Sequence, residues 1–288
     1  MTPPSEGRLS RLNRLVTALG GLKCLKCGQP LLPDGDAPHL RCGQGHSVDV
    51  NRKGYVNLLS RAYPGIYDAR LFEARSRVLD AAYLPVAEAL NRLLAETEST
   101  RILDAGCGEG WYLHRLLQME PARLAAGCDL SADAIRRAAA WPEPILWCVA
   151  DLRRLPFRDR SFDAVLDILS PADYGAFRRA LRPGGWLIKV YPGQDYLREI
   201  RAAASLPAYQ EGDVSAYLSS RAQVCRTERV HETVPLTEAL WRDFLLMTPL
   251  TQGLDEAALD RLAEKPAGQM TFDLRVSLCR FPEEAEDS

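Results

Sequence analysis

Three glycines in five residues, Gly106, Gly108 and Gly110, lie between an apolar stretch that ends at Asp104 and an amphipathic stretch that begins at Trp111. Glycine permits a sharp turn and the close approach of a ligand, because it has no Cβ. A strand, a glycine loop and a helix in this order direct the free N–H groups of the helix toward a nucleotide-like ligand. The stretch therefore predicts a nucleotide-binding α/β fold.

The spacing of the glycines narrows the kind of nucleotide. A dinucleotide fingerprint has glycines at loop positions one, three and six, whereas here the third glycine is at position five and Trp111 is at position six. Two further acids end apolar runs: Asp129 follows 124–128, and Asp151 follows 145–150. Each acid could simply cap a helix. Three acids that end three successive strands would instead meet at one edge of a parallel sheet.

Strands and helices alternate along most of the chain, which predicts a doubly wound, mostly parallel sheet. Pro85 is expected to divide one long helical pattern into two helices. The expected helices lie within 1–22 and over 69–96, 111–119, 132–140 and 174–181. The expected parallel strands end at 104, 128, 150, 168 and 191. Two antiparallel strands are expected, at 223–234 and 270–281.

Four candidate metal ligands precede this pattern. Cys24 and Cys27 form a C-x2-C pair, and Cys42 and His46 follow after fourteen residues as C-x3-H. Three thiolates and one imidazole complete a closed tetrahedral zinc shell, so the expected role of the metal is structural. Zinc would also stabilise a turn-rich segment that is too small to form its own core. His39 is the alternative fourth ligand, on the turn side.

Charge is distributed unevenly. The formal net charge is −2, so the whole molecule is not a basic nucleic-acid binder. From Arg8 to Arg77, however, twelve basic residues stand against five acidic ones, which gives this segment +7 and the remainder −9. The asymmetry favours an N-terminal part that meets a polyanion, with ordinary charge scatter as the alternative. Without an apolar run of about 18 residues or a signal peptide, we expect a cytoplasmic protein with no membrane span.

Together these motifs resemble the RlmA-type 23S rRNA guanine-N1 methyltransferases, which use S-adenosyl-L-methionine (SAM). The resemblance extends from about Cys24 to Phe281 and rests on the four ribbon ligands and the stretches 53–59 (KGYVNLL), 104–112 (DAGCGEGWY), 155–157 (LPF), 182–186 (RPGGW) and 247–249 (MTP). It implies a homodimer that methylates guanine N1 in a 23S rRNA hairpin near the peptide exit tunnel. In some producers this mark confers resistance to macrolides such as tylosin.

The expected cofactor site combines the glycine loop with this resemblance. SAM would lie across Gly106–Gly110, with Asp129 at the ribose hydroxyls and Asp151 at the adenine amino group. The resemblance implies contacts from Tyr83, Gly108 and Glu109, and from Tyr196, where the family can carry His. The complete expected set is Tyr83, Asp104, Gly106, Gly108, Glu109, Gly110, Asp129, Leu130, Asp151, Leu152 and Tyr196.

Methyl transfer is an in-line displacement at a sulfonium, so the enzyme mainly supplies proximity and alignment. Guanine N1 carries a proton, and a nearby base or carbonyl acceptor should help to remove it. Asp167 and Ser170, near the end of the fourth strand, are the catalytic candidates, although Asp167 could instead bond to backbone. Ser170 occupies the polar place of a stretch, 169–174, similar to the Asn/Asp-Pro-Pro-Tyr/Phe motif of amine methyltransferases.

The expected organisation is an N-terminal arm (1–22), a zinc-binding ribbon (23–60), a helical linker (61–98), a SAM-dependent methyltransferase domain (99–282) and a disordered tail (283–288). Tyr63, Tyr67 and Trp111 could stack an extruded base, or could be packing residues. Two other functions remain open. One is a methyltransferase of a small molecule or peptide recruited from this family, which the +7 segment disfavours. The other is a non-catalytic zinc-ribbon RNA-binding protein, which the intact glycine loop disfavours.

Overall fold

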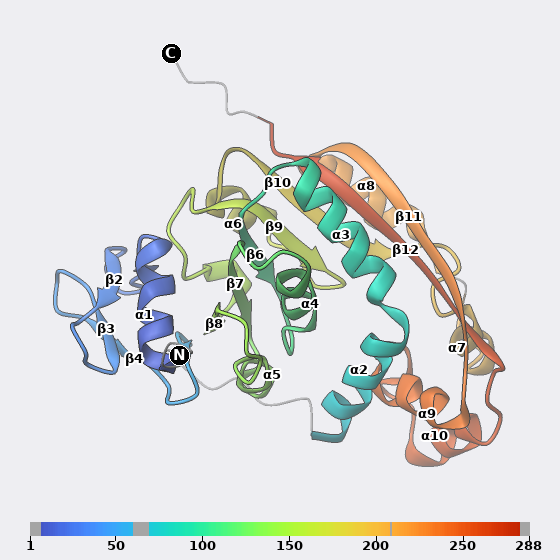
Figure 1. Ribbon diagram of the computed structural model, residues 1–288. Helices are drawn as coiled ribbons and strands as arrows, with labels where there is room; N and C mark the ends of the chain where they lie inside the picture. The colour runs from blue at the N-terminus through green and yellow to red at the C-terminus, as the bar shows by residue number, and fades with distance from the viewer. Residues whose placement is uncertain (1–6, 60–68, 208, 283–288) are drawn as a thin grey trace, which may run out of the picture.

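The computed structural model describes residues 7–59, 69–207 and 209–282 and contains two β-sheets (Figure 1). The smaller sheet is antiparallel and has the strands β1 (Leu22–Lys23), β2 (Pro30–Pro33), β3 (His39–Arg41) and β4 (Ser47–Asp49). The larger sheet has the strands β5 (Tyr55–Asn57), β6 (Arg101–Ala105), β7 (Leu124–Asp129), β8 (Ile145–Val149), β9 (Phe162–Ile168), β10 (Leu181–Pro192), β11 (Gln223–Pro235) and β12 (Gln269–Arg280).

The larger sheet has the order β11-β12-β10-β9-β6-β7-β8-β5. Neighbouring strands from β10 to β5 are parallel, and β12 runs antiparallel to both β10 and β11. The chain reverses its direction of winding at β6, because β7 and β8 lie on one side of it and β9 and β10 on the other. Such a switch point opens a crevice at the carboxyl ends of the strands. The predicted doubly wound α/β fold is confirmed.

Helices cover both faces of this sheet (Figure 1). Successive residues of β6 enter opposite cores, Ile102 on one face and Leu103 on the other, as the alternation of a strand requires. The first core contains residues of α3 (Leu84–Glu96), α4 (Trp111–Met119), α5 (Ala132–Ala138), α7 (Arg198–Ala203) and α9 (Glu238–Met247). The second contains residues of α1 (Arg8–Ala18), α6 (Tyr174–Ala180) and α8 (Glu211–Arg221).

A helical layer lies beside the carboxyl edge of the sheet. It contains α2 (Ala69–Ala82), which packs on α9, and α10 (Glu256–Ala263), which also contacts α9. Arg77 of α2 makes a bidentate ion pair with Asp243 of α9, with both N–O distances 2.7 Å. Helix α2 ends at Ala82 and α3 begins at Leu84, with Pro85 in its first turn, where a missing N–H costs nothing. The predicted division at Pro85 is therefore correct.

The ribbon is not an independent module. Buried side chains of α1 and of the small sheet, including Leu12, Leu31 and Leu40, belong to the same core as the α6 face of the large sheet. Strand β5, which the sequence placed in the ribbon, pairs in parallel with β8 at the edge of the large sheet. Its three residues are too short for a sequence pattern to show which sheet they join. None of the described helices is long and apolar enough to span a membrane.

Candidate active site and metal centre

The glycine loop has the geometry that its sequence predicts. Gly106, Gly108 and Gly110 all have positive φ values, +84°, +55° and +76°, which favour glycine. Side chains also crowd two of them: a Cβ on Gly106 would collide with the Ser170 side chain, and one on Gly110 with the Trp147 ring. The loop thus has the strand–turn–helix form, and α4 begins directly after Gly110.

Asp129 at the end of β7 holds the loop in place. Its Oδ2 accepts a hydrogen bond from the Gly108 N–H at 2.9 Å, and its Oδ1 accepts one from the Ser131 N–H at 2.8 Å. Ser131 in turn caps α5. Each carboxylate oxygen can accept two hydrogen bonds, so Asp129 keeps capacity for the hydroxyls of a ribose. Leu130 follows it, half-buried.

Asp104 is the penultimate residue of β6, two residues before Gly106, and is almost completely buried. Neither of its carboxylate oxygens has a hydrogen-bond partner among the described residues. Burial, reinforced by the nearby charges of Asp167 and Asp129, raises the pKa of Asp104 to about 8. A buried carboxylate without partners is costly. A ligand that brings a cation to this position would supply the missing partner.

Further unpaired polar atoms surround the same loop. Glu109 Oε2, Tyr112 Oη and Arg75 Nε are buried and have no partner in the part of the chain that the structure describes. Arg75 comes from α2, and one of its terminal nitrogens lies 3.1 Å from the position of a Cβ on Gly108. Its neighbour Ser76 donates a hydrogen bond to Glu109 Oε1 at 2.7 Å. A ligand with both an ammonium and a carboxylate group, such as the methionine part of SAM, matches this donor set.

Sequence reasoning missed Arg75, although it predicted Glu109. A lone arginine in an amphipathic helix reads as an exposed residue, and nothing in its spacing connects it with a loop more than thirty residues later. Only the packing of α2 against the glycine loop shows the relation. Arg77, two residues later, does not contact the glycine loop but pairs with Asp243 of α9.

Tyr83 and Tyr196, which the resemblance added, do meet in space. Their hydroxyl oxygens are 2.5 Å apart. Tyr83 lies between α2 and α3, and its ring packs edge-on against Phe272 of β12. Burial raises the pKa of Tyr196 to about 12, while the hydrogen bond from Tyr83 and the charge of Arg75 act in the opposite direction. Both phenols therefore remain neutral hydrogen-bonding groups near Arg75.

Asp151 follows β8 and caps a short 3-10 helix, η1 (Leu152–Arg154). Its carboxylate pairs with the Arg153 side chain, with a shortest N–O distance of 2.7 Å. This hydrogen bond holds the pKa of Asp151 below its usual value. Leu152 Cδ1 lies 3.7 Å from the position of a Cβ on Gly106, so η1 adjoins the glycine loop.

The two catalytic candidates differ in exposure. Ser170 is half-buried, and its side chain lies against Gly106, beside the loop. Asp167 is fully buried, and its Oδ2 accepts a hydrogen bond from Lys189 Nζ at 2.8 Å. Despite this partner, burial raises the pKa of Asp167 to about 6. Because Asp167 has no exposed surface, it cannot contact a guanine in this arrangement, which corrects the direct catalytic role expected for it.

Lys189 connects Asp167 with the backbone at Ser170. The same ammonium donates to the Ser170 carbonyl oxygen at 2.7 Å. Leu169, between them, has φ +52°, a conformation that residues with a side chain rarely adopt. Strain of this kind persists only where surrounding contacts impose it, and it clusters at functional sites. The buried pair thus holds the backbone of the Ser170 loop.

The aromatic residues proposed to stack a base give a different result. Trp111 is buried, and its Nε1 donates to Asp80 at 2.7 Å, so it is a packing residue and the stacking hypothesis is wrong for it. Trp111 is the first residue of α4, and its ring points toward α2, which carries Asp80. Tyr63 and Tyr67 lie outside the described residues.

The four predicted metal ligands converge on one point. The ligand atoms of Cys24, Cys27, Cys42 and His46 all lie within 4.8 Å of one another. Cys27 Sγ is 3.6 Å from Cys42 Sγ, and His46 Nδ1 is 3.6 Å from both Cys24 Sγ and Cys42 Sγ. With Zn–S and Zn–N distances of about 2.3 and 2.0 Å, a tetrahedral zinc site places its ligand atoms about 3.5–3.8 Å apart. The three separations of 3.6 Å fit this geometry.

The alternative ligand is elsewhere. His39 Nε2 lies 2.9 Å from Asp34 Oδ2, and Arg41 also pairs with Asp34. His39 therefore belongs to a surface ion-pair cluster on the hairpin, outside the metal group.

Comparison with known proteins places the chain in a family. Residues 102–185 match the model of a methyltransferase domain. The chain is 33% identical over 272 residues to the 23S rRNA (guanine(748)-N(1))-methyltransferase of Streptomyces fradiae, a match that covers 90% of this chain and 96% of that protein. It is 35% identical over 246 residues to a Bacillus subtilis protein named for 23S rRNA guanine-N1 methylation, with coverage of 81% and 87%.

A Micromonospora griseorubida protein with the same name is 35% identical over 200 residues, which cover 62% of this chain and 68% of that protein. The matches with the Streptomyces and Bacillus proteins extend over most of each chain, well beyond the methyltransferase domain alone. The chain is thus a SAM-dependent methyltransferase that belongs to the family of 23S rRNA (guanine-N1)-methyltransferases.

Proposed function

We propose that this protein transfers the methyl group of SAM to N1 of a guanine in 23S rRNA. The observation that supports it most is the match over 90% of the chain with the Streptomyces fradiae enzyme, which is named for guanine-N1 methylation of 23S rRNA. Ribosomal RNA also suits the +7 segment between Arg8 and Arg77. A 23S rRNA substrate would also be consistent with the cytoplasmic location that the sequence predicts. The homodimer and the link with macrolide resistance remain predictions from the resemblance.

The residues around the glycine loop fit SAM. We assign the methionine ammonium to Asp104 and the methionine carboxylate to Arg75, because these buried groups have unpaired atoms of complementary charge. Asp129 would accept the ribose hydroxyls and Asp151 the adenine amino group. Tyr83, Glu109 and Tyr196 border the same space, and Leu130 and Leu152 follow the two acids in the sequence. The cofactor would supply an electrophilic methyl group on a sulfonium.

The chain's own contribution to methyl transfer is alignment of the acceptor. Ser170 lies against Gly106, and Lys189 fixes its backbone carbonyl. Either its hydroxyl or a neighbouring carbonyl can accept a hydrogen bond from the guanine N1–H and so orient that nitrogen, and the proton itself would leave to water as N1 is methylated. Asp167 would act through Lys189 as a positioning residue. Proximity and orientation of this kind can account for a large part of a rate enhancement.

We propose one structural Zn²⁺ per chain, held by Cys24, Cys27, Cys42 and His46. Cys27→Ser should remove the metal and raise amide hydrogen exchange in β1–β4, because the small sheet depends on the metal for its folding energy. Strand β5 should remain protected, since it pairs with β8. The exposed Cys225 provides the control: Cys225→Ser should keep one zinc and wild-type exchange. Wild-type protein purified without chelators that contains no zinc would exclude this site.

The substrate class can be tested by methyl incorporation. Tritiated SAM should label unmodified 23S rRNA transcribed in vitro and leave 16S rRNA unlabelled. A small-molecule or peptide methyltransferase would label neither RNA, and a non-catalytic RNA-binding protein would not bind S-adenosylhomocysteine. Calorimetry with S-adenosylhomocysteine, run beside the labelling, therefore distinguishes the three functions.

A further inference from the structure

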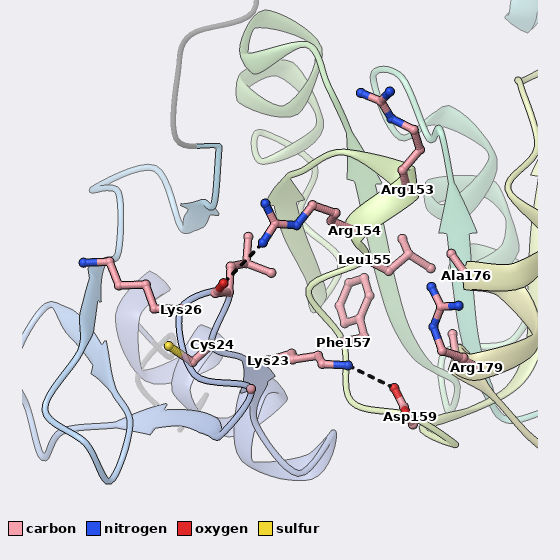
Figure 2. Close-up of a pocket in the computed structure, with 13 residues that line it drawn as sticks. Lys23, Cys24, Lys26, Arg153, Arg154, Leu155, Phe157, Asp159, Ala176 and Arg179 are labelled. Carbon is pink, nitrogen blue, oxygen red and sulfur yellow. Dashed lines mark hydrogen bonds and ion pairs between the residues drawn. The ribbon is translucent and has the colours of Figure 1, made fainter.

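A basic groove separates the four-stranded ribbon from the methyltransferase domain (Figure 2). We call it the ribbon–domain groove. It has a volume of about 290 Å³, and Leu155 and Phe157 give it apolar surface. Its charged lining consists of five basic residues and one acidic residue: Lys23, Lys26, Arg153, Arg154, Arg179 and Asp159.

The positive charge of this groove contrasts with the molecule as a whole, which has a formal charge of −2. Lys26 and Arg179 are exposed and make no ion pair with any residue that the structure describes. Among the described residues, the Arg154 guanidinium donates to the Leu25 carbonyl, at 3.3 Å, and makes no ion pair. Lys23 pairs with Asp159 and Arg153 with Asp151, but both cations keep exposed surface, and such pairs contribute little. Unpaired cations gathered in a concave surface create a field that attracts a polyanion.

The two walls of the groove are held at a fixed separation. The Lys23 N–H donates to the Pro156 carbonyl at 2.6 Å, and Leu22 forms an isolated β-bridge with Phe157. Arg154 reaches from the domain to the ribbon through its bond with Leu25, as Figure 2 shows. A ligand that contacts both walls would therefore not have to order them first, which lowers the cost of binding.

The groove also leads toward the methyl donor. Arg153 and Arg154 belong to η1, whose first residue, Leu152, lies beside Gly106 of the cofactor loop. The same wall of the groove includes α6, which carries Arg179 and begins four residues after Ser170. Basic side chains of η1 and α6 thus flank the path between the ribbon and the glycine loop.

We propose that the ribbon–domain groove binds the phosphate backbone of the RNA strand that carries the methylated base. This inference rests on the proposed function, because it takes RNA as the acceptor. Phosphate contacts fix the register of a nucleic acid without reading its sequence. The planar guanidinium of arginine suits a phosphate, and three of the five cations are the arginines of η1 and α6. A fourth, Lys23, lies where the ribbon contacts the domain directly. Contacts in this groove would set which nucleotide reaches Ser170.

The test replaces the two unpaired cations, one on each side of the groove, in the variant Lys26→Ala/Arg179→Ala. Affinity for unmodified 23S rRNA should fall about tenfold at 0.1 M salt, and the slope of log K against log salt should become shallower by about 1.5–2, since each lost phosphate contact removes roughly one unit. The control is Arg242→Ala/Lys265→Ala, which removes two exposed cations. Arg242 lies in α9 and Lys265 follows α10, at the other end of the molecule (Figure 1). The control variant should leave both quantities unchanged.

Affinity for S-adenosylhomocysteine and the melting temperature should be unchanged in both variants, because neither pair contacts the cofactor loop. If the wild type methylates 23S rRNA but the groove variant keeps the wild-type affinity and salt slope, the groove inference fails and the proposed function stands. An equal loss in the control variant would also overturn it, because the effect would then belong to net charge. If the wild type methylates no rRNA, the proposed function and the groove inference fail together.

Discussion

Lys189→Met is expected to destabilise the protein by about 3 kcal/mol at pH 8, because the buried carboxyl group of Asp167 loses its partner and must take up a proton to stay buried. For a domain of this size the melting temperature should fall by about 6–12 °C. Turnover at a permissive temperature should also fall, since the Ser170 carbonyl loses its donor and the strained Leu169 backbone can relax. Thermal unfolding and methyl incorporation measure the two effects.

The effect should depend on pH. The folded-state pKa of Asp167 is about 6, above the value of about 3.9 for an unfolded chain. A raised carboxyl pKa contributes stability below pH 4 that is lost as pH rises through 6, and removal of Lys189 raises that pKa further. The variant should therefore be close to the wild type near pH 5 and much weaker at pH 8.

A second variant controls for simple loss of packing. Asp167→Leu combined with Lys189→Met removes both charges and should recover most of the stability, because an apolar pair often replaces a buried ion pair without loss. A single Lys189→Met variant with wild-type stability at pH 8 would show that the pair does not hold this part of the site.

Asp129→Ala should lower affinity for S-adenosylhomocysteine by about tenfold to a hundredfold, the equivalent of roughly 1.5–3 kcal/mol for charged hydrogen bonds. The substitution removes the proposed ribose acceptor and also the acceptor of the Gly108 and Ser131 N–H groups. Calorimetric titration of the folded variant measures the change.

Asp129→Asn separates the two contributions. Its amide oxygen can still accept one of the two backbone N–H groups, so the loop should keep more support than in the alanine variant, while the other N–H and the ribose lose their charged acceptor. We expect an affinity between those of the wild type and the alanine variant. An unchanged dissociation constant in Asp129→Ala would remove this residue from the cofactor site.

The sequence predicted those parts of the site that depend on local rules. The glycine loop required positive φ values, and Asp104, Asp129 and Asp151 lie at or within two residues of the carboxyl ends of the neighbouring strands β6, β7 and β8. Parallel pairing alone brings such residues together, so three motifs far apart in sequence predicted one crevice. The Cys and His spacing likewise predicted four converging ligand atoms.

Features that depend on tertiary packing could not be predicted in this way. Arg75 reaches the loop because α2 packs across it. Trp111 is adjacent to the loop in sequence, yet its ring is buried and donates a hydrogen bond to Asp80 of α2. The sequence around Asp167 does not distinguish a buried strand position from an exposed one. The structure shows that Asp167 is buried and that Lys189, opposite it on β10, is its partner. The shared core of ribbon and domain has no sequence signature.

The central claim is that guanine N1 of 23S rRNA is the acceptor, and the position of the transferred methyl group tests it most directly. Unmodified 23S rRNA should be incubated with the protein and SAM, digested to nucleosides and, in parallel, copied by reverse transcriptase. A methyl group on N1 blocks the pairing edge of guanine, so we expect 1-methylguanosine in the digest and one new stop next to a single guanine. Protein that binds S-adenosylhomocysteine but leaves the RNA unmethylated, or that methylates a different nucleoside, would contradict the account.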